Sequence, residues 1–88
     1  MTLNATLQAA RDMGVPERYA VMRRLAFLQP QIKHLEREIW GARRRMDRSR
    51  DPLIKGLSES LIRDQEKDLR PLKREATALL NHVNGKET

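Results

Sequence analysis

The fold is decided by residues 21–46, which read VMRRLAFLQPQIKHLEREIWGARRRM. Apolar side chains recur through this stretch at alternating intervals of four and three residues: Val21, Leu25, Leu28, Ile32, Leu35, Ile39, Ala42 and Met46. This spacing is typical of the a/d seam of a coiled coil. It predicts one long helix over residues 16–47, beginning at Pro16, which is a favoured first helical position. Such a helix is roughly 48 Å long at 1.5 Å per residue.

Pro30 lies inside this predicted helix. A proline removes one backbone hydrogen bond and tends to kink a helix. The apolar seam nevertheless keeps its phase across Pro30, which falls at the outward-facing f position if Leu25 is placed at a. We therefore expect a continuous helix that is kinked near Pro30. A true break at Gln29 is the alternative interpretation.

Two further helices flank this one. Residues 3–13 carry apolar side chains at helical spacing and are followed by Gly14, a typical helix stop. Asp51 and Pro52 form a cap and first position for a helix over residues 52–83, which ends before Asn84 and Gly85. The turn between the two long helices is predicted at residues 48–50.

The third helix has a less regular seam. Its most apolar path runs through Ile54, Leu57, Leu61, Gln65, Leu69, Leu72, Ala76, Leu79 and Val83, with consecutive intervals of four that form a stutter. Folding the long helices about the turn pairs Ile39 with Leu61 and Val21 with Leu79. The expected fold is all-α, a single helical domain over residues 1–88. It combines a short N-terminal helix with a long antiparallel hairpin, as a coiled-coil-like structure or a small three-helix bundle.

Composition excludes several classes of protein. The chain has 88 residues, no cysteine and a net charge of +6, so disulfides, thiolate catalysis and Cys-type zinc sites are ruled out. No apolar run approaches the roughly 20 residues that span a bilayer, and the N-terminal stretch lacks the apolar core of a signal peptide. We expect no catalytic site, metal or cofactor, no membrane partner, and a cytoplasmic location.

Some apolar side chains lie off the main seam. The predicted interface residues are Tyr19, Phe27, Trp40 and Ile62. The first helix is long enough to fold back over Tyr19 and Phe27, but it cannot reach Trp40. Trp40 is therefore either partly exposed, which is ordinary for a single aromatic, or covered by a second copy or another partner, and we expect a homo-oligomer.

Positive charge is concentrated where the hairpin turns. The predicted anion-binding residues are Arg43, Arg44, Arg45, Arg48, Arg50 and Lys55. Asp47 and Asp51 offset two of these six cations, which leaves +4 of the total +6 in this segment. Arginine forks match phosphate oxygens, but cations also complement the C-terminal end of a helix dipole. Both interpretations stay open at the level of sequence.

Two functions follow from these patterns. The first is a non-enzymatic, oligomeric binding protein whose basic tip engages a polyanion, either nucleic acid or a nucleotide. The second is a small protein–protein adaptor or inhibitor that docks a target through the apolar face around Trp40. Neither pattern identifies the partner or the symmetry of an oligomer.

Overall fold

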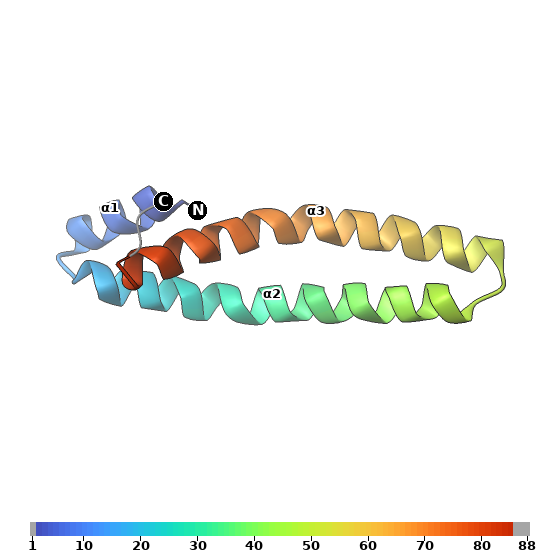
Figure 1. The fold of residues 1–88 in the computed structure, drawn as a ribbon. Coiled ribbons are helices and arrows are strands. Elements are labelled where there is room, and N and C mark those ends of the chain that lie inside the picture. Colours follow the sequence, from blue (N-terminus) through green and yellow to red (C-terminus); the bar gives the residue numbers. More distant parts are fainter. Residues whose placement is uncertain (1, 86–88) are drawn as a thin grey trace.

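Three helices and their connections make up the part of the chain that the computed structural model describes, residues 2–85. They are α1 (Leu3–Met13), α2 (Glu17–Arg48) and α3 (Pro52–Val83). The prediction of an all-α fold built from packed helices is confirmed. Figure 1 shows α2 and α3 running side by side from the turn at residues 49–51, with α1 at the opposite end. The described chain is elongated and measures 56 × 22 × 18 Å.

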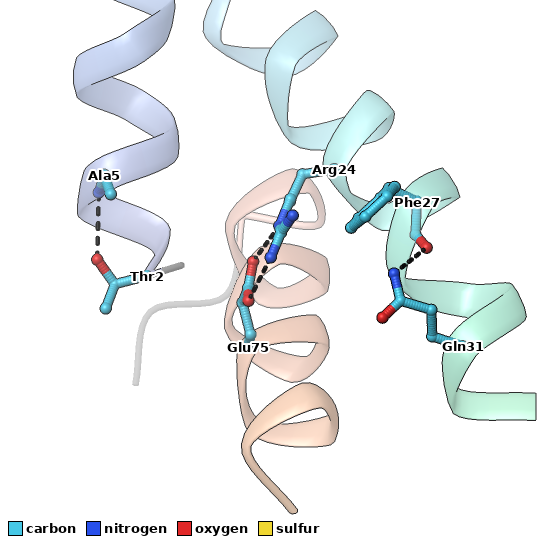
Figure 2. Close-up of polar contacts among 6 residues, drawn as sticks. All are labelled: Thr2, Ala5, Arg24, Phe27, Gln31 and Glu75. Atoms are coloured by element: carbon cyan, nitrogen blue, oxygen red, sulfur yellow. Dashed lines mark hydrogen bonds and ion pairs between the residues drawn. The ribbon is translucent and has the colours of Figure 1, made fainter. Parts of the chain in front are cut away.

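The helix ends follow from local chemistry. The Thr2 hydroxyl accepts a hydrogen bond of 3.2 Å from the Ala5 amide and caps α1 (Figure 2). At the other end of α1, Gly14 adopts the left-handed conformation with φ of 69°. The Asp51 carboxylate accepts a hydrogen bond of 2.9 Å from the Leu53 amide and caps α3. Both long helices continue through their internal prolines, Pro30 and Pro71.

The core has two clusters along the α2–α3 contact. One lies at the end remote from the turn and joins Val21, Leu25, Leu28, Ala76 and Leu79. Leu3 and Leu7 of α1 pack on this cluster, so α1 covers the core where the hairpin opens. The other cluster joins Ile39, Ala42, Ile62 and Leu69 nearer the turn. Between them, Ile32 packs against both clusters and makes the core continuous.

The seam of α3 differs from the predicted one in its first half. Ser58 and Ile62 are buried, whereas Leu57 and Leu61 are 63% and 38% exposed. The predicted stutter is therefore wrong, and so is the pairing of Ile39 with Leu61. The described seam instead runs through Ser58, Ile62, Gln65, Leu69, Leu72, Ala76, Leu79 and Val83, at regular intervals of four and three. Regular spacing keeps the contact face of α3 turned toward α2 without any change in helical twist.

Polar contacts join the long helices on their flanks. Arg24 of α2 pairs with Glu75 of α3 at 2.6 Å, and Figure 2 shows the two side chains facing each other across the helix contact. Glu36 pairs with Lys73 at 3.1 Å. In the middle of the seam, the side-chain amide of Gln65 donates a hydrogen bond to the Glu38 carboxylate.

Candidate functional site

The hairpin tip, residues 43–55, holds the six predicted anion-binding side chains. Arg43, Arg44, Arg45 and Arg48 belong to the last turns of α2, Arg50 lies in the turn, and Lys55 lies in the first turn of α3. All six are exposed. The connection is short, because Ser49 is the C-cap of α2 and Asp51 is the N-cap of α3. The cations of both helices therefore lie at the same end of the hairpin.

Two of the six cations contact other side chains among residues 2–85. Arg43 Nη2 lies 2.5 Å from Glu66 Oε1 on the neighbouring helix. The Arg44 guanidinium lies over the ring of Trp40, 4.6 Å from its centroid, in a cation–π contact. These two side chains are therefore partly held in place, and the charge of Arg43 is compensated.

The other four cations are Arg45, Arg48, Arg50 and Lys55. None of them forms an ion pair with another residue among 2–85. Of the two local acids, Asp51 uses its carboxylate to cap α3. The dipoles of α2 and α3 oppose each other here, because one helix ends where the other begins. The helix-dipole explanation therefore accounts for Arg45 and Arg48 near the C-terminal end of α2, but not for Lys55 at the N-terminal end of α3.

The predicted interface residues fall into two groups. Tyr19, Phe27 and Trp40 are 52%, 58% and 61% exposed. The expectation that α1 covers Tyr19 and Phe27 is wrong, because α1 packs instead on the core through Leu3 and Leu7. Ile62 was expected off the seam, yet it is only 9% exposed and belongs to the core. The prediction that Ile62 is an exposed interface residue is therefore wrong.

An open groove of about 840 Å³ runs beside Trp40 between α2 and α3. Its lining is rich in charged side chains: Lys33, Glu36, Arg37, Arg43, Glu66, Arg70 and Lys73. The two acids of this lining pair with Arg43 and Lys73. Lys33, Arg37 and Arg70 have no ion-pair partner within the described chain. The groove thus extends the positive surface from Arg43 away from the tip.

A further exposed surface was missed from the sequence. We define the α3 stripe as Ile54, Leu57 and Leu61, which are 43%, 63% and 38% exposed. The sequence pattern predicts these side chains in the core, because they form the most apolar path through that part of α3. Leu61 lines a small groove with Gly41 and Arg45 of α2. Glu66 of α3 lines the Trp40 groove. Leu61 lies about 140° around α3 from Glu66 at 3.6 residues per turn, so the stripe and the Trp40 groove lie on different flanks of the hairpin.

Metal-binding clusters and membrane-spanning helices are absent from residues 2–85. No group of three or more His, Cys, Asp or Glu side chains among residues 2–85 is arranged to hold a metal ion. None of the helices in the described chain is both long enough and apolar enough to cross a membrane. Comparisons with protein-family models, curated proteins and solved structures found no match.

Proposed function

We propose that this chain is a non-enzymatic binding protein whose hairpin tip engages a polyanion, either nucleic acid or a nucleotide. The observation that carries the proposal is the group of four exposed cations at the tip, Arg45, Arg48, Arg50 and Lys55, without acidic partners among residues 2–85. Because both long helices meet at the tip, these charges are held on one end of an elongated molecule.

The chemistry of the tip suits phosphate. Arginine presents a planar fork of donors that matches two phosphate oxygens at once. Contacts of this type position a protein on nucleic acid without reading its sequence. Lys33, Arg37 and Arg70 in the Trp40 groove extend the positive surface, so a chain of phosphates has a path that begins at the tip and continues along one flank.

The test is fluorescence anisotropy with labelled single- and double-stranded nucleic acid over a series of salt concentrations. The double variant Arg48→Glu with Arg50→Glu reverses two unpaired charges at the tip. Its control is Arg18→Glu with Arg74→Glu, which changes the net charge equally at the opposite end of the hairpin. Both control residues are exposed and form no ion pair with other described residues.

We expect micromolar or tighter binding at low salt. The logarithm of the affinity should fall with the logarithm of salt concentration, with a slope of about −0.9 for each phosphate contact on a duplex. The tip variant should lose at least about 10-fold in affinity, and the control should lose much less. Equal losses in the two variants, or no binding at low salt, would show that the tip is only a solvated helix end.

The exposed aromatic face supports a second candidate, a protein–protein adaptor or inhibitor. Trp40 is 61% exposed, although Arg44 lies over its ring. Tryptophan and arginine are the residues most enriched at energetically important positions of protein interfaces. Under this function, binding to a protein target tolerates salt and Trp40→Ala weakens it at least about 10-fold, while charge reversal at Arg48 and Arg50 has little effect.

A further inference from the structure

The α3 stripe lies outside the α2–α3 contact. Ile54, Leu57 and Leu61 are separated by three and four residues, so they share one flank of α3. Regular seam spacing brings Ser58 and Ile62 toward α2 and leaves the stripe exposed. Three large apolar side chains in sequence along one helix flank form a continuous surface, unlike single exposed leucines elsewhere on a protein.

Charge is ordered along the same flank. Asp64 and Asp68 follow Leu57 and Leu61 by seven residues each, so they continue the line of the stripe away from the turn. Neither aspartate forms an ion pair with another residue in the described range 2–85. At the turn end of the stripe, Arg50 lies in the connection directly before Asp51, the N-cap of α3. It is exposed and forms no ion pair with another residue among 2–85. In chain order the cation of the connection comes first, then the apolar stripe, then the two acids.

A surface with this order of charges can pair with a second copy of itself in one orientation. If a second copy of the flank lies antiparallel with Leu57 opposite Leu57, Ile54 lies one residue from the level of Leu61 in the second copy. The connection that holds Arg50 then lies near Asp64 of the second copy, and by symmetry the same contact forms twice. A parallel copy would instead place Arg50 beside Arg50 and Asp64 beside Asp64, which is unfavourable for like charges.

We propose that the α3 stripe binds a second copy of this chain, in an antiparallel and isologous dimer centred on Leu57. Two-fold symmetry requires a surface that complements itself, and the flank from Ile54 to Asp68 has this property together with Arg50 in the adjacent connection. The helical flank is roughly 21 Å long at 1.5 Å per residue, which is enough for several layers of helix packing. Two hairpins joined in this way form a four-helix contact near their turns, and both basic tips lie close to the dimer centre.

Single-cysteine crosslinking tests the geometry, because the native chain has no cysteine. In Leu57→Cys the two thiols lie near the symmetry axis, so mild oxidation should give a covalent dimer. Leu80→Cys is the control, since Leu80 is also exposed on α3 but its two copies would lie some 65–70 Å apart at 1.5 Å per residue. We expect a crosslinking rate at least about 10-fold higher for Leu57→Cys. Equal rates would overturn the proposal.

Sedimentation velocity over a concentration series tests the energetics. Leu57→Asp should raise the dimer dissociation constant at least about 10-fold, because it places two carboxylates at the centre of an apolar contact. Leu80→Asp should leave the constant nearly unchanged. Circular dichroism should show intact helices in both variants, since both side chains lie outside the core. A chain that stays monomeric at about 1 mM, or a dimer that Leu57→Asp leaves intact, would overturn the proposal.

A charge exchange tests the orientation. Asp64→Arg alone should weaken the dimer, and adding Arg50→Asp should restore much of the affinity, since the pair is then reversed rather than lost. Failure of the double variant to recover would reject the antiparallel alignment. The readout is self-association, so it is independent of the nucleic-acid experiment. Leu57→Asp changes no tip cation, and binding of nucleic acid by this monomeric variant would separate the two proposals.

Discussion

Arg24 of α2 and Glu75 of α3 form a two-bond ion pair between positions 51 residues apart in sequence. Arg24 Nε donates to Glu75 Oε2 at 2.6 Å, and Arg24 Nη2 donates to Glu75 Oε1 at 3.1 Å (Figure 2). The Glu75 side chain is 6% exposed and that of Arg24 is 22% exposed. This pair lies beside the core cluster under α1, so it fixes the alignment of the two long helices at the end remote from the turn.

The first prediction concerns the stability that this pair contributes. Glu75→Gln leaves the Arg24 guanidinium half-buried without its carboxylate, so the free energy of unfolding should fall by about 1–3 kcal/mol. The loss stays below that of a fully buried pair because Arg24 retains some access to water. Urea denaturation followed by circular dichroism measures the change. Glu59→Gln is the control, because Glu59 is exposed and has no ion pair among residues 2–85.

The second prediction is a pH dependence of stability. The hydrogen bonds from Arg24 hold the pKa of Glu75 below its ordinary value of 4.5, although burial opposes this shift. A carboxylate with a lowered folded pKa stabilises the protein above its unfolded pKa, and this contribution is lost as the pH falls through the folded pKa. Stability should therefore decline as the pH drops below about 4.5. Urea midpoints of Glu75→Gln should decline less over the same range, and parallel curves would contradict this assignment.

The third prediction distinguishes the two possible seams of α3. Ile62 is in the core and Leu61 is outside it. Ile62→Ala should therefore lower the free energy of unfolding by about 2–4 kcal/mol, as for other large core side chains. Leu61→Ala should lower it by less than about 1 kcal/mol when measured at protein concentrations too low for self-association. The reverse order of the two losses would indicate that the seam runs through Leu61.

Much of the helical architecture could be predicted from local sequence. The regular seam of residues 21–46, the Asp51–Pro52 cap and the stop at Gly14 are short-range signals, and each acts within a few residues. The first half of α3 was harder, because Ile54, Leu57 and Leu61 offer more apolar surface than Ser58 and Ile62. The choice between these faces depends on which side meets α2. At the far end of α3, the side that meets α2 is set by Leu69, Leu72, Ala76 and Leu79. Because the seam spacing is regular, the same side of α3 faces α2 as far back as Ser58.

The hairpin tip, too, could be predicted only in part from the sequence. The sequence identifies six cations, but it does not show which of them are compensated. Glu66 reaches Arg43 across the hairpin, and the two residues are 23 positions apart. Arg44 lies over Trp40 only because both lie on one face of α2. The Arg43–Glu66 contact depends on the relative rotation of the two long helices, and a shift of one residue in their alignment would change it. The Arg44–Trp40 contact is local to α2, where the two residues are four positions apart.

The last prediction uses two glycines with opposite expected effects. Gly56 lies inside α3 with helical geometry, and a Cβ at this position would meet nothing within 4 Å. Gly56→Ala should therefore raise the free energy of unfolding by about 1 kcal/mol, because alanine loses less backbone entropy in a helix. Gly14 also has open space around it, but its φ of 69° lies in the left-handed region.

Gly14→Ala should accordingly lower stability by about 1 kcal/mol, since a Cβ disfavours the left-handed conformation. Thermal and urea unfolding of both variants measure these changes, with circular dichroism to show that the helices persist. The comparison isolates backbone conformation, because neither added methyl group meets a neighbouring atom within 4 Å. If both substitutions stabilised the protein, α1 would not end in the left-handed turn at Gly14, and the path of the chain between α1 and α2 would have to differ.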